Sequence, residues 1–257
     1  MFEKINFCIY LFNKLIKKSE KKFNISLYYF FPLRIIHLLI EKVLLDKILS
    51  KNYFNISDYF LKKINFKSLI IISAGIGTDA SFEATMIKNF NVKKIIAIDP
   101  TPIGKKTIKA IQTKKIYFEN KALYIHNRKI KAFVPFEADN ANVNLSIDNL
   151  YNTNKYIVLK CVNLKKLLKI YNIKKIDILK LDIEGVADKV IENCIKIGCF
   201  PKQITFEIER PDSILKQIEF FKRFIKLIFL LKKNYKIYNT TKKKLGLRSV
   251  ILAVLKK

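Results

Sequence analysis

Two glycines and an aspartate, each placed just after a short apolar run, are the residues that could bind a cofactor. Gly75 and Gly77 follow the run 69–72, and Asp99 follows the run 95–98. A Gly-x-Gly turn lets a ligand approach the backbone closely, and the helix that follows offers unpaired N–H groups to an anion. A carboxylate at the end of the second run can accept hydrogen bonds from both hydroxyls of a ribose. The pattern therefore predicts a site for an adenosine-type ligand.

A second group of polar residues supplies candidate proton acceptors. Asp182 and Glu184 follow one apolar run, and Glu209 follows the next. Carboxylates are costly to place at the end of a buried strand unless a ligand or partner compensates for their charge. A carboxylate within hydrogen-bond reach of a substrate hydroxyl can act as a general base. The structural alternatives are that Asp182 caps the next helix and that Glu209 pairs with Arg210.

Apolar runs of strand length alternate with helical patterns over most of the chain. Such continuous runs are typical of strands buried on both faces of a parallel sheet. The first strand–helix–strand unit has Asp79 as the expected N-cap of its helix. Further helices are expected at 164–171, 186–197 and 214–231, and further strands at 116–118, 176–181, 204–208, 235–240 and 249–255. We therefore predict an α/β fold, a mostly parallel, doubly wound Rossmann-like sheet with an antiparallel C-terminal strand pair.

The middle of the chain is less regular. Strands expected at 122–125 and 130–134 flank a polar turn and predict a hairpin. The stretch 135–151 is polar and rich in Asn, so it is expected to be a long loop, and loops of this length are often functional.

The first 63 residues differ from the rest and predict a helical N-terminal segment. Apolar residues recur at helical spacing in 5–16, 36–44 and 56–64. We divide the chain into a helical N-terminal subdomain, 1–63, and a Rossmann-like domain, 64–257. The helices could form a lid, a dimer surface or a basic amphipathic contact with an anionic membrane. The alternative is that they cover one edge of the sheet.

Composition narrows the function classes. The chain has 257 residues, half of them hydrophobic, which excludes a wholly disordered protein, and no uncharged apolar run is long enough for a spanning helix. The net charge is +29, but Arg contributes only five of the 50 basic residues. Because base-specific recognition favours Arg, we interpret the charge as Lys-rich background composition rather than a nucleic-acid site. The four cysteines lack metal-ligand spacing, and the N-terminus fits a signal peptide poorly because Glu3 comes early and no small-residue cleavage site follows, so a cytoplasmic protein without a metal is expected.

Three separated blocks of the sequence resemble FkbM-family methyltransferases, and they occur in the family's order. They are 72–79 with Phe82-Glu83 and Asp99-Pro100-Thr101-Pro102, then 176–185, then 201–211. The resemblance covers about residues 68 to 211. It implies an S-adenosylmethionine-dependent methyltransferase with a class I Rossmann-like sheet. It also implies that the acceptor is a hydroxyl group on a sugar, a glycan or a small metabolite.

The resemblance also implies roles for individual residues. The methionine part of the cofactor would be held by Ser73, Ala74, Gly75 and Gly77, and the ribose by Asp99. The cofactor half of the site also includes Asp79, Pro100 and Thr101. Asp182 would lie near the transferred methyl group with Glu184 close by, and the base is Asp182 or Glu184, with Glu209 in reserve. Because a sulfonium is already a good leaving group, no metal is required.

Two positions depart from the family pattern. Class I methyltransferases usually have an acidic residue where Ser73 stands. In the family, Gly-Ala-Glu usually follows the fourth strand. Here Gly185 is followed by Val186, Ala187 and Asp188, so the acidic residue comes one position later than in the family.

Three alternatives to this methyltransferase interpretation stay open. The Gly-x-Gly turn alone also fits a nicotinamide-dependent oxidoreductase, although no Tyr-x-x-x-Lys follows the fourth strand. The charge of +29 suggests an RNA methyltransferase. A non-enzymatic membrane-binding or partner-binding protein is the third alternative, and the intact glycine pair, Asp99 and Asp182 argue against it.

Overall fold

The computed structural model describes residues 44–47, 52–63, 68–135, 145–150, 153–209, 214–241 and 248–256. The strands are β1 (Asp46–Lys47), β2 (Tyr53–Ile56), β3 (Tyr59–Lys62), β4 (Leu69–Ala74), β5 (Val92–Ile98), β6 (Ile116–Glu119), β7 (Ala122–Leu123), β8 (Lys129–Phe133), β9 (Tyr156–Val162), β10 (Ile178–Leu181), β11 (Gln203–Glu209), β12 (Tyr235–Asn239) and β13 (Arg248–Leu255). The helices are α3 (Ser81–Asn89), α4 (Pro102–Lys109), α5 (Leu164–Ile170), α6 (Ala187–Lys196) and α7 (Ile214–Asn234).

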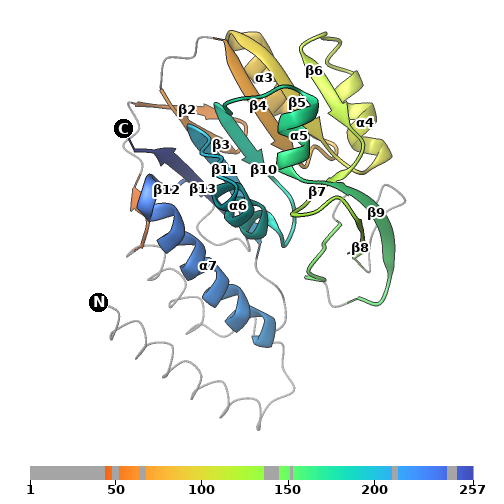
Figure 1. Ribbon diagram of the computed structural model, residues 1–257, viewed down its shortest axis with the longest axis vertical. Helices are drawn as coiled ribbons and strands as arrows, with labels where there is room; N and C mark the ends of the chain where they lie inside the picture. Colours follow the sequence, from red (N-terminus) through yellow and green to blue (C-terminus); the bar gives the residue numbers. More distant parts are fainter. Residues whose placement is uncertain are drawn as a thin grey trace.

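Eight of the described strands form one sheet in the order β1-β12-β13-β11-β10-β4-β5-β6 (Figure 1). Strands β11, β10, β4, β5 and β6 are parallel to one another. The chain builds outward from β4 to β6 and then crosses back to β10, so the strand order reverses between β4 and β10. In an open α/β sheet, ligands bind outside the carboxyl ends of the strands at such a switch point.

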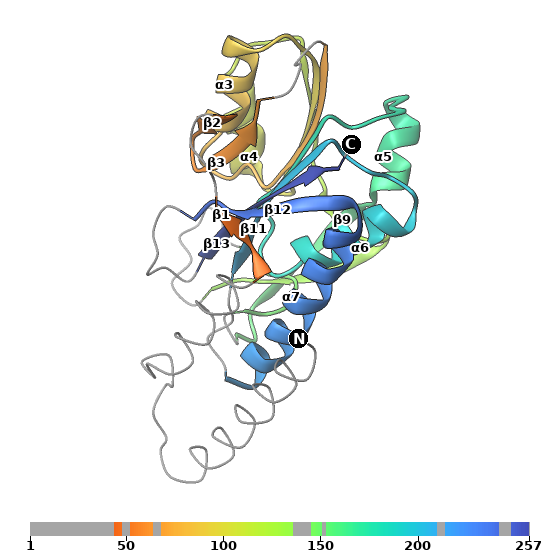
Figure 2. The ribbon, with the colours of Figure 1, turned by 90° about the vertical axis from the view of Figure 1, so that its left-hand side faces the viewer.

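Helices cover both faces of this sheet, as predicted (Figure 2). On one face α5, α6 and α7 pack on a continuous apolar layer that includes Ile72, Leu179 and Phe206. On the other face α3 and the β2–β3 hairpin pack on the side chains of Ile71 and Ile178. Alternate residues of the central strands thus point into two separate cores. This explains why the sequence shows unbroken apolar runs.

The C-terminal strands form the predicted antiparallel pair. β13 pairs antiparallel with both β11 and β12, and β12 pairs parallel with the short strand β1. The helices and strands predicted after residue 163 agree with the structure within a few residues.

The prediction of a third N-terminal helix at 56–64 is wrong. The described part of this segment is an antiparallel hairpin, in which Tyr53 pairs with Lys62 and Ile56 with Tyr59. The side chain of Gln203 fastens the hairpin to the sheet: it accepts a hydrogen bond from the Lys62 N–H at 2.8 Å and donates one to the Lys62 carbonyl at 3.0 Å. The other two expected N-terminal helices lie outside the described residues, except for Leu44, and the domain boundary at residue 63 stays a prediction.

The prediction of a hairpin at 122–134 is also wrong. β7 and β8 do not pair with each other, because β9 lies between them, parallel to β7 and antiparallel to β8. β9 is apolar apart from Lys160, but no strand is predicted for it from the sequence because it follows a long polar stretch. Most of the loop predicted at 135–151 lies outside the described residues, but 145–150 are described.

No helix in the described part of the chain is both long and apolar enough to cross a membrane.

Candidate active site

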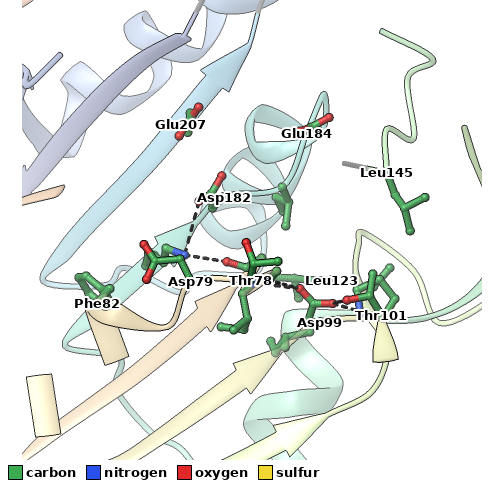
Figure 3. Close-up of a pocket in the computed structure, with 18 of the residues that line it drawn as sticks. Thr78, Asp79, Phe82, Asp99, Thr101, Leu123, Leu145, Asp182, Glu184 and Glu207 are labelled. Atoms are coloured by element: carbon green, nitrogen blue, oxygen red, sulfur yellow. Dashed lines mark hydrogen bonds and ion pairs between the residues drawn. The ribbon is translucent and has the colours of Figure 1, made fainter. Parts of the chain in front are cut away.

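A cavity of about 280 Å³ lies at the switch point, at the carboxyl ends of β4, β5 and β10 (Figure 3). Six of the eight residues predicted to bind a cofactor line it: Gly75, Gly77, Asp79, Asp99, Pro100 and Thr101. Asp182 and Glu184 line it as well. Residues that are far apart in the sequence are therefore brought together at one edge of the sheet.

The turn after β4 requires glycine for two reasons. Gly75 has φ +79°, and a Cβ atom built there would lie 1.7 Å from the backbone oxygen of Asp182. The backbone of β4 therefore approaches that of β10 more closely than any side chain permits. Gly77 also has a positive φ of 55°. The turn leaves its backbone open to the cavity.

Asp99 is buried beside this turn, with 4% of its surface exposed. Its Oδ2 accepts hydrogen bonds from the N–H groups of Ile76 (2.8 Å) and Gly77 (2.9 Å). Its Oδ1 accepts from the N–H of Thr101 at 2.8 Å and from the Thr101 hydroxyl. Both carboxylate oxygens are thus engaged by the protein itself. Asp99 fixes the glycine turn against the loop after β5, a role that the sequence pattern does not reveal.

Ser73 and Ala74 lie behind the cavity rather than in its lining. Both are buried, and the Ser73 hydroxyl donates a hydrogen bond to the carboxylate of Glu83, which is itself fully buried in α3. An acidic group therefore stands next to Ser73, although it comes from the following helix. Asp79 binds the N-terminus of the same helix, because its Oδ1 accepts from the Ser81 N–H at 2.8 Å. The structure places the N-cap itself at Ala80.

Asp182 is held by two side chains. Its Oδ2 accepts a hydrogen bond from the Tyr59 hydroxyl at 2.7 Å and lies 3.6 Å from Lys180 Nζ. Lys180 is almost completely buried and donates to the Gly75 carbonyl at 2.7 Å. Oδ1 has no partner among the described residues, and 37% of the Asp182 side chain is exposed. One oxygen is therefore anchored and the other can meet a ligand.

A second cavity, of about 260 Å³, adjoins the first. Glu207 and Val186 line both cavities, and Glu209 lines only the second. One wall is a cluster around Arg223 of α7, whose Nε and Nη2 bind the two carboxylate oxygens of Asp188 at 2.6 and 2.7 Å. Arg223 also binds Asp148, from the loop 145–150, and the Gly185 carbonyl. Asp188, which stands one position late for the family pattern, is thus a partner of this arginine.

Acidic residues are concentrated at these cavities. Six acidic residues and one basic residue, Lys180, are among the described residues that line the first cavity. The second has five acidic residues, one of them shared, and three basic residues. The whole chain has 50 basic and 21 acidic residues. The site is therefore an acidic hollow in a basic protein, and its field favours a cationic ligand.

Three further lining residues escape the sequence patterns. Ser57, Asp58 and Tyr59 enter the first cavity from the β2–β3 hairpin. The Ser57 hydroxyl accepts a hydrogen bond from the Ser81 hydroxyl at 2.8 Å and so ties the hairpin to α3. The described residues contain no group of three or more side chains that could hold a metal ion.

The sequence matches the model of a known protein family. Residues 71–237, more than half of the chain, match the model of the methyltransferase FkbM domain. No curated protein is significantly similar in sequence.

Several solved structures have a similar chain trace. The methyltransferase FkbM of Methylobacillus flagellatus KT is 12% identical, with a TM-score of 0.47 over 74% of this chain and 44% of that one. The fibrillarin pre-rRNA processing protein of Methanococcus jannaschii is 11% identical, with a TM-score of 0.41 over 82% and 84%. The precorrin-6y C5,15-methyltransferase of Geobacter metallireducens GS-15 is 13% identical, with a TM-score of 0.36 over 74% and 82%. The chain spans less than half the length of the first of these.

Proposed function

The chain belongs to the methyltransferase FkbM domain family, and we propose that it transfers a methyl group from S-adenosylmethionine to a hydroxyl group of a sugar, a glycan or a small metabolite. S-adenosylmethionine would supply an electrophilic methyl group on a positively charged sulfur. The observation that carries the proposal is the first cavity, where a glycine turn and six carboxylates meet at the switch point of the sheet.

The charge of the cavity separates this cofactor from a nicotinamide dinucleotide. A dinucleotide carries a pyrophosphate, which needs cations or free N–H groups at a helix N-terminus. Lys180 is the one basic residue among the described lining residues, and its ammonium already contacts Gly75 and Asp182. Asp79 already binds the N–H of Ser81 at the start of α3. A cationic sulfonium and ammonium suit this lining, and a pyrophosphate does not.

The shape of the cavity supports the adenosyl part. The Gly75 turn provides a surface that any larger residue would fill. The same cavity is also lined by apolar residues: Ala122, Leu123, Leu145, Ile147 and Leu159. Ligand sites commonly combine an apolar wall with a few placed polar groups.

Asp182 is our candidate for the general base. Its anchored Oδ2 fixes the carboxylate, and Oδ1 is available to accept the proton of an attacking hydroxyl. Glu184 lines the same cavity and is the second candidate. Glu209 lines only the second cavity, so we assign it to the acceptor side.

The acceptor would enter through the second cavity. This cavity is lined by carboxylates, by Lys189 and Lys216, and by Phe220, a mixture that suits a polyhydroxylated molecule. The same mixture is unfavourable for the phosphates of RNA, because acidic residues outnumber basic ones. Contact of the basic N-terminal segment with an anionic membrane stays a prediction, since most of residues 1–63 lie outside the described residues.

Calorimetry with S-adenosylmethionine, S-adenosylhomocysteine and NADH tests the cofactor. We expect both adenosyl ligands to bind and NADH to fail. Asp99→Asn should weaken binding at least about tenfold, because the loss of a charge-assisted acceptor for two N–H groups loosens the glycine turn.

Asp177→Asn is the matched control for this variant. Asp177 is also a buried carboxylate that accepts a backbone N–H, from Ile70 at 2.8 Å, but it lies at the opposite end of the sheet. We expect Asp177→Asn to lower stability without changing affinity. Binding of NADH without binding of S-adenosylhomocysteine would overturn the proposed function.

A further inference from the structure

The β2–β3 hairpin completes the cofactor cavity although it precedes the family domain. The family match begins at residue 71, whereas Tyr59 belongs to β3. The hairpin is firmly attached to the domain: Leu61 and Ile56 are buried in the core under α3, and Gln203 pairs with the backbone of Lys62. The position of Tyr59 is therefore determined by the sheet itself.

Tyr59 spans the distance from this core to Asp182. The residue is 4% exposed, and its ring meets the ring of Phe82 edge-on at 5.7 Å. Its hydroxyl donates to Asp182 Oδ2 at 2.7 Å, and Lys180 Nζ lies 5.2 Å from the centre of its ring. Asp182, Tyr59 and Lys180 thus form one contact cluster at the floor of the cavity.

The chemistry of the phenol makes it a constant donor. Burial, followed by the negative charge of Asp182, raises the pKa of Tyr59 well above its usual value. The hydroxyl consequently keeps its proton at neutral pH. As a donor it holds one carboxylate oxygen of Asp182 in place and leaves the other toward the ligand.

We propose that Tyr59 is a positioning residue for Asp182 and that the β2–β3 hairpin is an integral part of the methyl-transfer site. This inference rests on the proposed function, because it takes Asp182 to face the sulfonium and the acceptor. It extends the working unit of the enzyme upstream of the matched domain, at least to residue 53 where β2 begins. A domain excised at residue 71 would lack this wall.

The test replaces Tyr59 by Phe, which keeps the ring and removes only the donor. Removal of the donor frees the carboxylate of Asp182 to turn away from the position in which Oδ1 faces the ligand. A carboxylate that faces the sulfonium favours cationic S-adenosylmethionine over S-adenosylhomocysteine, whose sulfur is neutral. The ratio of the two affinities should therefore fall about threefold to tenfold in Tyr59→Phe, as measured by calorimetry.

Several other charged groups lie near Asp182 and also act on a bound cation. Those that line the cavity are Lys180 on β10, Glu207 on β11, Asp58 on the hairpin turn, Asp79 and Asp99 after β4 and β5, and Glu184. Glu83 lies behind the cavity and acts on Tyr59. The affinities for the two ligands are therefore compared as a ratio in each variant at the same pH, so that contributions common to all variants cancel.

Tyr53→Phe is the matched control. Tyr53 lies in the same hairpin, but its ring packs against Tyr238 with centroids 5.5 Å apart, away from the cavity. We expect the wild-type ratio of affinities for Tyr53→Phe, and we expect Tyr59→Phe to have no further effect when it is combined with Asp182→Asn. The combined variant keeps the test informative if Tyr59→Phe also lowers stability.

The outcomes distinguish the two proposals. Failure of the wild type to bind S-adenosylmethionine or S-adenosylhomocysteine would overturn the proposed function, and this inference with it. Tight binding by the wild type, together with an unchanged ratio of affinities in Tyr59→Phe, would overturn this inference alone. A melting temperature of Tyr59→Phe that falls without any change in this ratio would mean that Tyr59 has only a structural role, which would also overturn the inference.

Discussion

Replacement of Arg223 by Met should destabilise the protein by removing the central cation of the second cavity. Arg223 donates four hydrogen bonds: two to Asp188, one to Asp148 and one to the Gly185 carbonyl at 3.1 Å. These contacts join α7, α6, the loop after β10 and the loop 145–150. Met keeps most of the apolar length of the arginine side chain, so the loss reports mainly the guanidinium.

The size of the loss in stability depends on which carboxylates are left without a cationic partner. Asp148 keeps an ion pair with Lys189 at 2.6 Å. Asp188 loses Arg223 as its cationic partner, and its side chain is only 11% exposed. Breaking a buried ion pair on one side costs about 3–5 kcal/mol. Because Arg223 itself is 29% exposed, we expect a value near the lower end, about 3 kcal/mol, which corresponds to a melting temperature lower by roughly 6–12 °C for a chain of this size.

Lys226→Met in the same helix is the control. Lys226 pairs with Glu192 at 3.0 Å, but its side chain is 69% exposed, so loss of this pair should cost less than about 1 kcal/mol. Urea denaturation of both variants gives the comparison, and Asp188→Asn in the Arg223→Met background should recover part of the loss. If Arg223→Met is as stable as Lys226→Met, the arginine cluster does not hold the cavity wall together.

Two further predictions concern the glycine turn and the thiols. Gly75→Ala should abolish binding of S-adenosylhomocysteine and lower the free energy of unfolding by several kcal/mol, because the new Cβ would lie 1.7 Å from the Asp182 backbone oxygen. The control is Gly198→Ala, at a similar φ of +73° but with no atom within 4 Å of the new Cβ. It should lower the free energy of unfolding, measured by thermal denaturation, by only about 1–2 kcal/mol. Iodoacetamide should label the partly exposed Cys199 well before Cys161 at pH 8, as read by peptide mass spectrometry, because burial raises the pKa of Cys161 to about 11. Equal labelling rates would contradict the burial of Cys161.

The sheet and its ligand edge could be predicted because their signals are local. Apolar runs mark the buried strands, and the residues just after them must lie at the carboxyl edge. For this reason Gly75, Asp99 and Asp182 could be placed at one site before their partners were known. Their partners could not be predicted in the same way. The bonds from Asp99 to the glycine turn and from Ser73 to Glu83 depend on side-chain geometry that spacing does not encode.

The β2–β3 hairpin shows how a local pattern can mislead. Apolar residues at 56, 59, 60 and 61 fit a helical spacing, and the turn contains no Gly, Asn or Pro to break it. Ser57 makes the turn instead, with φ +54°, a conformation that few non-glycine residues adopt. The packing of Tyr59 and Leu61 under α3 overrides the helical pattern. The ion pairs of Arg223 could not be predicted from the sequence either, because its two carboxylate partners lie 35 and 75 residues away along the chain.

The position of β13 constrains the order in which the protein can assemble during synthesis. β13 is made after β11 and β12, yet it lies between them and pairs with both. On the ribosome, the nascent parallel strands can associate early, but β12 and the N-terminal β1 have no place in the sheet until β13 has emerged. Until then the open side of β11 is an unpaired edge that can recruit other chains. Insertion of β13 between two strands that are made before it therefore prolongs the time for which the edge of β11 is exposed.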